Sequence, residues 1–328
     1  MKILVTGANG LLGVNIVREL LLRNTEVHAL VRPTSDLRGL SGLDIKYIAG
    51  DILDTESLDR AVKDCEVVIH AAANTSQWPT QYRYYEPVNV KGTQNVINIC
   101  RKHNVSRVVY VSTANAFGNG PRENPGTELS EFNGFRYNSG YMISKYLAQQ
   151  WVLTEVEKYR LPVVVVNPTF MIGPYDVKPG SGRIILMGLH KKWIACPPGG
   201  KNFIHVRDVA TGICNAIEYG IPGECYLLAN ENLSYQEFYA KLDRVTGQQT
   251  AKFNLPGSVL KAIGIACSCW ESVSGMAIPI SFVNARLLCL ENYYSGEKAI
   301  SALRMPQTPV EKAIEDAIAW FQENPVRV

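Results

Sequence analysis

Long apolar runs, blocks of like charge and a secretion signal are all missing from this sequence. Nowhere in its 328 residues do 18 apolar residues stand together, so a membrane-spanning helix is not expected. No five or six like charges are consecutive, and the formal net charge of +3 is spread along the chain, which argues against a nucleic-acid partner. The opening residues MKILVTG enter a strand pattern directly and lack a signal peptide's apolar centre and cleavage site, so we expect a cytoplasmic protein.

Cysteine pairing of the kind that binds metals is also missing. The eight cysteines lie mostly inside apolar segments. The one close pair, Cys267 and Cys269, has no second pair that could complete a zinc site. We therefore expect reduced cysteines in the core and no bound metal.

The sequence does contain ample material for a core, with 46% hydrophobic and 19% charged residues. In the first half, short β-branched segments alternate with helix-length segments. Strands are expected at 2–6, 26–31, 66–73, 107–113 and 162–167, and helices near 11–23, 55–63, 88–103 and 139–159. Because these strands lack a polar alternate face, they are typical of a parallel sheet with helices on both sides. The pattern predicts an α/β, doubly wound Rossmann domain over residues 1–168.

The rhythm changes after Pro168, where Gly- and Pro-rich loops separate short strands from helices. We expect residues 169–328 to form mainly a smaller substrate-binding lobe, with the segment near 203–219 packing back on the Rossmann domain. Further elements are expected at 225–230, 234–246 and 309–323. Residues 255–290 contain only three charged side chains, so this stretch lines an apolar pocket, contacts another protein, or packs in the core.

Three glycines follow the first strand at three-residue spacing: Gly7, Gly10 and Gly13 in TGANGLLG. Glycines permit a tight turn and let a pyrophosphate approach the backbone amides, while a helix starting near Leu11 directs its positive end at the phosphates. Since the triplet follows a strand and opens a helix, it predicts a dinucleotide site.

The end of the second strand bears on which dinucleotide is bound. An acid there would bind the ribose 2′-hydroxyl of NAD, whereas an arginine accommodates the extra phosphate of NADP. Val31 stands in that place and Arg32 follows it, with Arg38 as a second cation. The sequence therefore favours NADP(H) over NAD, unless Arg32 is simply a solvated strand-end residue.

A tyrosine precedes a lysine by four residues twice, as Tyr141–Lys145 and as Tyr294–Lys298. Tyr141 begins a helix-length segment just after a strand and loop, which in a doubly wound sheet is the carboxyl edge where a dinucleotide binds. The second copy lies beyond the second lobe, and Gly296 weakens the helix that would align its lysine. We select Tyr141 and Lys145.

Several ordered motifs give this chain a specific resemblance to the extended short-chain dehydrogenase/reductase superfamily. They are TGANGLLG (6–13), GDILD (50–54), HAAA (70–73), NVKGTQNV (89–96), VSTANAFG (111–118), YMISK (141–145), NPTFMIGP (167–174) and FIHVRDVA (203–210). The likeness covers essentially the whole chain. Within the superfamily, residues 166–185 and 293–321 look most like the dihydroflavonol 4-reductase and 3β-hydroxysteroid dehydrogenase branch and its bacterial relatives.

The resemblance implies a general acid, Tyr141, that protonates a carbonyl oxygen as hydride arrives. An ordinary phenol has a pKa of about 10, and Lys145 with the oxidised nicotinamide would lower it. Matching the loop motif selects Thr113 as the hydroxyl that polarises the reacting oxygen, with Ser112 as the alternative. The implied cofactor contacts are Gly7, Gly10, Leu11, Leu12, Gly13, Arg32, Asp51, Ile52, Ala71, Ala72, Lys145 and Pro168.

Other candidates carry two interpretations each. Asn89 matches a motif near the cofactor or serves a helix start, and Asp51 is also a typical turn acid. His70 is more typical of a packed core histidine than of a catalyst, while His205 and Asp208 are expected to tie the second lobe to the first. An aromatic cluster, formed by Trp78, Tyr82, Tyr84 and Tyr85, lines the substrate side or packs on the surface.

The favoured function is a reductase or alcohol dehydrogenase for a fairly apolar carbonyl compound. A nucleotide-sugar epimerase or dehydratase with resident NAD is the alternative; such enzymes carry an acid at the second strand end and an arginine–aspartate pair before FIHV. Here Val31 and Lys201–Asn202 stand in those places, although Lys201 keeps a positive charge and Arg183 could add another. A nucleotide-sensing protein without catalysis is a third hypothesis. The resemblance also implies a homodimer through the helices near 88–103 and 139–159.

Overall fold

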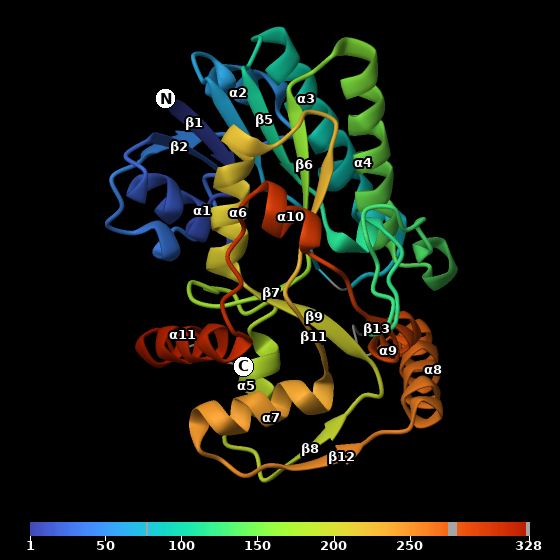
Figure 1. Ribbon diagram of the computed structural model, residues 1–328. Coiled ribbons are helices and arrows are strands. Elements are labelled where there is room, and N and C mark those ends of the chain that lie inside the picture. The colour runs from blue at the N-terminus through green and yellow to red at the C-terminus, as the bar shows by residue number, and fades with distance from the viewer. Residues whose placement is uncertain (77, 275–280, 326–328) are drawn as a thin grey trace.

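A seven-stranded, all-parallel sheet forms the upper half of the molecule (Figure 1) in this computed structural model, which describes residues 1–76, 78–274 and 281–325. The strand order is β10-β6-β5-β4-β1-β2-β3. The strands are β1 (Lys2–Thr6), β2 (Glu26–Val31), β3 (Lys46–Ala49), β4 (Val67–His70), β5 (Arg107–Val111), β6 (Val163–Pro168) and β10 (Cys225–Leu228).

The strands inside the sheet send alternate side chains to two separate apolar layers. One layer, with Ile3, Val5, Ile69 and Val109, packs against α1 (Leu11–Leu22) and α6 (Val206–Tyr219). The other, with Leu4, Val68, Val108 and Val165, packs against α2 (Thr55–Val62), α3 (Thr93–Lys102) and α4 (Gly140–Tyr159). Strands buried on both faces explain the missing polar alternation, and the predicted doubly wound α/β fold is confirmed.

Two local elements differ from the sequence prediction. Strand β3 was not predicted, because it lies at the sheet edge and its exposed Lys46 and Tyr47 hide the apolar pattern. The segment expected as one helix near 88–103 begins with a π-helix, η3 (Pro87–Gly92), before α3. The short 3-10 helices are η1 (Arg38–Leu40), η2 (Tyr82–Tyr84), η4 (Ala114–Ala116) and η5 (Gly134–Tyr137).

The lower half of the molecule contains two smaller sheets. One comprises β11 (Glu231–Ser234), β9 (Gly200–His205), β13 (Glu291–Asn292) and β7 (Phe170–Ile172); the other pairs β8 (Trp193–Cys196) with β12 (Ala251–Asn254). The larger packs on α5 (Arg183–Gly188), α7 (Tyr235–Thr246) and α11 (Val310–Glu323). Phe203 of β9 stacks on Phe238 of α7 with ring centroids 4.5 Å apart, at the centre of this second core.

The chain crosses between the two halves more often than the sequence indicated. Helix α6 packs on α1, as expected for the segment near 203–219, but the strand that precedes it belongs to the smaller sheet. Strand β10, which the sequence pattern assigned to the second lobe, instead pairs with β6 in the large sheet. A short apolar strand does not reveal which sheet it joins, since that depends on the path of the chain before it.

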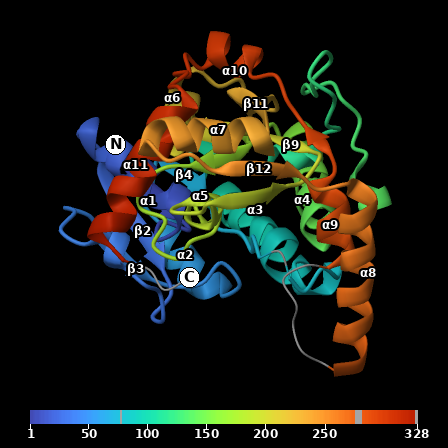
Figure 2. The ribbon, with the colours of Figure 1, turned by 90° about the horizontal axis from the view of Figure 1, so that it is seen from below.

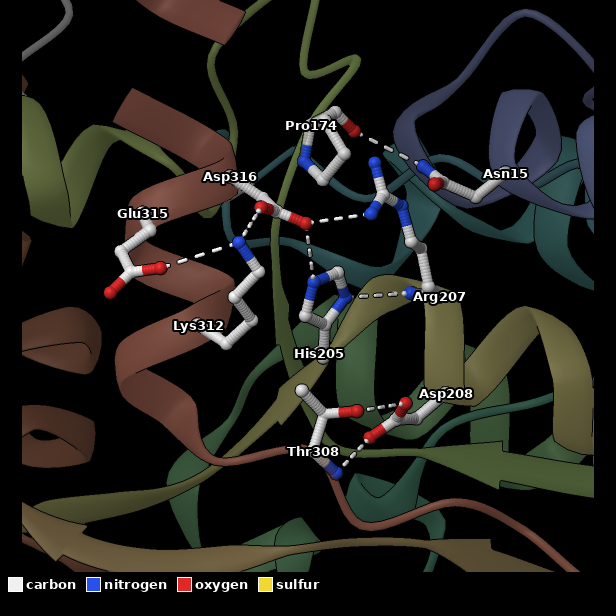
Figure 3. Close-up of polar contacts among 9 residues, drawn as sticks. All are labelled: Asn15, Pro174, His205, Arg207, Asp208, Thr308, Lys312, Glu315 and Asp316. Carbon is white, nitrogen blue, oxygen red and sulfur yellow. Dashed lines mark hydrogen bonds and ion pairs between the residues drawn. The ribbon is translucent and has the colours of Figure 1, made fainter. Parts of the chain in front are cut away.

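Polar contacts between α6 and the C-terminal segment join the two halves (Figure 3). His205 caps α6 by accepting from the Arg207 N–H at 3.0 Å, and its Nε2 lies 3.2 Å from the Asp316 carboxylate of α11. Asp208 accepts two hydrogen bonds from Thr308, at 2.7 and 2.8 Å. The predicted role of His205 and Asp208 in tying the lobes together is confirmed.

Helix α8 (Gly257–Ser274) lies at the margin of the molecule (Figure 2) beside α9 (Phe282–Leu288), while α10 (Glu297–Ala302) lies by β10. Val259, Ile263 and Trp270 of α8 are exposed and do not pack in the core, whereas Leu260 of α8 and Ala285 of α9 are buried. Residues 275–280 of that stretch lie outside the described residues.

No helix among the described residues is long and apolar enough to cross a membrane. Cys65, Cys100, Cys196 and Cys214 are buried as expected, whereas Cys269 is exposed.

Candidate active site

The glycine loop between β1 and α1 packs too tightly for side chains at two of its three positions. Gly7 has a φ of +70°, and a Cβ there would lie 2.7 Å from the backbone of Ala72. A Cβ on Gly13 would lie 2.1 Å from the carbonyl oxygen of Gly7. At Gly10 the nearest atom would be 3.5 Å away, an ordinary contact. The loop geometry therefore requires glycine at positions 7 and 13, whereas position 10 has room for a Cβ atom.

The amino end of α1 is suited to a phosphate group. Gly10 is its N-cap, and no side chain caps the helix, so the first-turn N–H groups keep their hydrogen-bonding capacity. Leu11 is half-buried and Leu12 is buried in this first turn. Because a pyrophosphate needs close backbone approach and free amides, the residues of this loop fit a dinucleotide.

Positive charge at the end of β2 is concentrated on Arg32. Val31 is buried, whereas Arg32 is exposed and its guanidinium makes no ion pair with the part of the chain that the structure describes. Arg38, the expected second cation, pairs instead with Asp36 at 2.8 Å. That pairing lowers the pKa of Asp36 to about 2, so Arg38 is already neutralised by a neighbour.

The remaining positions implied for the cofactor also lie near the carboxyl ends of the strands. The Asp51 carboxylate accepts the Leu53 N–H at 2.9 Å, as a turn acid does, and Ile52 is buried. After β4, the Ala72 N–H donates to the Thr6 hydroxyl at 3.3 Å, which links this segment to β1. Ala71 is half-buried beside it, and Pro168 ends β6.

Tyr141 and Thr113 come together from α4 and from the turn after β5. Ser139 caps α4 by accepting the Met142 N–H, which places Tyr141 in the first turn. Burial raises the pKa of Tyr141, and an interaction with the Thr113 side chain partly opposes this rise. Ser112 interacts instead with Tyr110, whose pKa is raised by burial, and partly opposes that rise. Of the two hydroxyls, Thr113 is therefore the one placed beside the phenol.

Lys145 is buried one turn further along α4. Its Nζ donates to the Val111 carbonyl at 2.9 Å and lies 4.8 Å from the centroid of the Tyr110 ring. Burial lowers the pKa of Lys145 to about 7. Burial thus acts on both groups and drives each toward its neutral form, and the lowering of the Tyr141 pKa by Lys145 and the oxidised nicotinamide stays a prediction.

Asn89 and His70 are buried residues that make hydrogen bonds next to the site. Asn89 lies inside η3 and caps no helix. Its side-chain oxygen accepts the Asn74 N–H, and its NH2 group donates to the Asn74 carbonyl and, at 3.0 Å, to the Ser144 hydroxyl. The Ser144 hydroxyl in turn donates to the Tyr141 carbonyl at 2.8 Å. His70 is fully buried between Thr6 and Thr93, at 2.8 and 3.1 Å, and burial lowers its pKa to about 3. The prediction of a core histidine is confirmed.

Sequence reasoning missed one buried amide pair. Asn167, at the end of β6, donates to the Thr113 carbonyl at 2.9 Å and to the Gln149 side chain at 2.7 Å. Both side chains are fully buried. Gln149 is two turns beyond Tyr141 and one beyond Lys145, so helical spacing could have indicated it. The pair fixes the Thr113 turn relative to α4.

Only part of the predicted aromatic cluster reaches the site. Tyr85 is buried and meets Tyr141 edge to face, with ring centroids 6.2 Å apart. Tyr82 is half-buried, whereas Tyr84 and Trp78 are exposed.

The second tyrosine–lysine pair does not form a catalytic arrangement. Tyr294 precedes α10, and its hydroxyl donates to Asn292 at 3.1 Å. Lys298 pairs with Glu224 at 2.6 Å. Tyr294 and Lys298 thus each have other partners, which agrees with the choice of Tyr141 and Lys145 from the sequence. Over the described ranges, which omit 77, 275–280 and 326–328, no group of three or more His, Cys, Asp or Glu could hold a metal ion.

Known proteins are similar to this chain along most of its length. Residues 3–229 match the family model described as "NAD dependent epimerase/dehydratase family". A Synechocystis protein named "Putative dihydroflavonol 4-reductase" is 32% identical over 98% of this chain and 94% of its own length. Sterol demethylase protein B of Methylococcus capsulatus is 31% identical over 99% of each chain. The crystal structure of gox2253 superimposes with a TM-score of 0.85 at 29% identity, over 98% of both chains.

Proposed function

The chain belongs to the NAD-dependent epimerase/dehydratase family, and we propose that it is an NADP(H)-dependent reductase that interconverts a ketone or aldehyde and its alcohol on a fairly apolar small molecule. Membership makes it an NAD(P)-dependent oxidoreductase of the extended short-chain dehydrogenase/reductase type. The observation that supports the proposal is that α4 and the turn after β5 bring Tyr141 and Thr113 together, with Lys145 one turn further along α4 and bonded to the end of β5.

In the proposed reaction, Tyr141 passes its phenolic proton to the substrate oxygen during reduction and takes it back during oxidation. The Thr113 hydroxyl donates to the same oxygen and stabilises the charge that develops there. Lys145 follows Tyr141 by one turn of α4, and its cationic form favours the phenolate. When bound, the nicotinamide supplies or accepts the hydride. Asn167 and Asn89 hold these groups in register through Thr113 and Ser144.

Two features favour a reductase over a sugar-nucleotide epimerase. No acid stands at the end of β2, and the relatives named for dihydroflavonol and sterol chemistry support an apolar substrate. The epimerase hypothesis would use Arg183 as a second cation. Arg183 is exposed at the start of α5, and the preceding residue, Gly182, packs on Phe321 of α11. A sensing protein without catalysis is less consistent with retention of both Tyr141 and Lys145. The homodimer through α3 and α4 stays a prediction.

We expect the purified protein to take up NADPH reversibly and to consume it in the presence of apolar ketones or aldehydes. A panel of cyclic ketones, sterol-like ketones and aldehydes, followed by NADPH absorbance, measures this directly. Protein that retains NAD through purification and consumes no NADPH with any carbonyl compound would instead support the epimerase hypothesis.

Replacing Arg32 by alanine is expected to weaken NADPH binding roughly 10- to 100-fold, because the substitution removes a charge-assisted bond to the 2′-phosphate. NADH affinity should not change. Arg38→Ala is the matched control, with a smaller effect because Arg38 already pairs with Asp36. Titration of protein fluorescence with each cofactor gives the dissociation constants. Equal affinities for NADPH and NADH that ignore Arg32→Ala would contradict the NADP assignment.

A further inference from the structure

Helix α8 presents an apolar face to solvent. It packs on α9, and its two buried residues, Leu260 and Gly264, are one turn apart. A Cβ on Gly264 would lie 2.7 Å from the Ala285 side chain, so the helices approach closely along this stripe. Further round the helix, the exposed apolar residues are Val259, Ala262, Ile263, Ala266 and Trp270. Their three- and four-residue spacing places them on one helical face, which the packing on α9 leaves uncovered.

The two-stranded sheet of β8 and β12 is also apolar on its outer face. Its register pairs Trp193 with Ala251 and Ala195 with Phe253, and alternate residues of a strand share a face. Trp193 is 66% exposed and Phe253 is 57% exposed. Two residues separate β12 from α8, and both elements lie in the lower half of the molecule (Figure 1). Exposed aromatic and aliphatic side chains thus gather on consecutive elements, as they do at sites that contact a protein or a membrane.

Only positive charge accompanies these apolar residues. Residues 190–195 and 249–270 include four lysines and no aspartate or glutamate. Lys252 pairs with Asp243 of α7. Lys191, Lys192 and Lys261 are exposed and make no ion pair with the described part of the chain. An apolar surface bordered by unpaired lysines is complementary to acyl chains beneath anionic headgroups.

A second copy of this chain fits the same surface less well. In an interface with two-fold symmetry the same residues meet on both sides, so lysines of one copy would approach those of the other. These two segments contain no carboxylate that could offset the repulsion. Aliphatic side chains such as Val259 and Ile263 suit acyl chains, while tryptophan is enriched where acyl chains meet headgroups.

We propose that α8 and the outer face of the β8–β12 sheet dock the protein on the surface of an anionic phospholipid bilayer. Helix α8 lies in the plane of the interface, with its exposed apolar face among the upper parts of the acyl chains. The three unpaired lysines contact the headgroup phosphates. Docking does not depend on the proposed function, because Tyr141 and Thr113 belong to the other half of the molecule.

Co-sedimentation with lipid vesicles tests this surface directly. The full-length protein is mixed with vesicles of phosphatidylcholine alone, or of equal parts phosphatidylcholine and phosphatidylglycerol. At low salt, partitioning onto the anionic vesicles should exceed partitioning onto the neutral ones roughly 10- to 100-fold. Added salt should reduce the difference, because it screens the lysines. No binding to anionic vesicles, or equal binding to both kinds, overturns the inference.

A variant of α8 tests the apolar contribution. Replacing Ile263 and Trp270 together by serine removes exposed side chains, so the free energy of unfolding should hardly change. Partitioning onto anionic vesicles should fall at least about 10-fold. The matched control replaces Leu129 and Ile221 by serine, two exposed apolar residues outside α8 and the β8–β12 sheet, and should bind like the wild type. Vesicle binding that survives the α8 variant unchanged contradicts the proposal.

A lysine variant tests the electrostatic contribution. It carries Lys191→Gln, Lys192→Gln and Lys261→Gln. Its control has the same net charge and replaces three other exposed lysines, Lys46→Gln, Lys63→Gln and Lys178→Gln. The first variant should lose the preference for anionic vesicles, whereas the control should keep it. Equal losses in the two variants would show that net charge, rather than this surface, attracts the protein.

Size-exclusion chromatography without lipid tests the alternative occupant. Wild-type protein and the α8 variant should elute at the same position, because no contact between copies is assigned to α8. A wild-type oligomer that the α8 variant dissociates would overturn the lipid assignment in favour of a second copy.

Discussion

Replacing Tyr141 by phenylalanine is expected to lower kcat for carbonyl reduction by about 1,000-fold, the range lost when a general acid is removed. Phenylalanine keeps the ring that meets Tyr85 edge to face, so the packing around α4 should survive. The substitution removes only the hydroxyl whose pKa responds to Thr113. Because the glycine loop is untouched, NADPH should bind with nearly unchanged affinity. Single-turnover NADPH oxidation and a parallel cofactor titration measure the two quantities separately.

Tyr294→Phe is the matched control, since Tyr294 belongs to the second tyrosine–lysine pair of the same chain. It loses a 3.1 Å hydrogen bond to Asn292, so we expect a loss of about 1 kcal/mol in the free energy of unfolding. Activity should fall no more than a few-fold. If Tyr141→Phe retains wild-type turnover, the phenol is not the acid. A drop in NADPH affinity as large as the drop in kcat would show that the side chain matters for binding rather than for proton transfer.

Alanine at Gly13 is expected to reduce the free energy of unfolding by about 3 kcal/mol, because its Cβ would enter a contact that both backbones must relieve. The methyl group would lie 2.1 Å from the Gly7 carbonyl oxygen, and neither atom belongs to a flexible side chain. Urea denaturation without cofactor measures this cost. NADPH binding should be lost as well, since the amino end of α1 moves relative to β1.

Gly10→Ala separates folding from binding in the same loop. Its Cβ would have 3.5 Å to the nearest atom, and the backbone of Gly10 is extended, with φ −82° and ψ 167°, which any residue adopts. Stability should change by less than about 1 kcal/mol. NADPH affinity should nevertheless fall roughly 10- to 100-fold, because a methyl group interferes with the amide–phosphate bonds. Equal destabilisation by both substitutions, or unchanged NADPH affinity in Gly10→Ala, would contradict this division of roles.

The sequence by itself determined the doubly wound sheet and the elements that bear the site. Strands with no polar alternate face must be covered on both sides, and the alternate side chains of β1, β4 and β5 do divide between two cores. The glycine triplet, the helix that starts after Gly10 and the helix that carries Tyr141 and Lys145 are local features, set by spacing and capping residues. Such local features can be predicted from a sequence because the interacting groups are neighbours along the chain.

Tertiary structure decided whatever depends on which distant segments meet. It put β10 beside β6 rather than in the second lobe, neutralised Arg38 with Asp36, and left Arg32 exposed. It also brought Asn167 to Thr113 and Lys201 to the strand beside Asn292. Burial raises the pKa of Tyr141 and lowers that of Lys145, because a charge loses its water only once the surrounding chain has closed around it. Such desolvation arises from packing among residues remote in sequence, so no local sequence pattern could have predicted it.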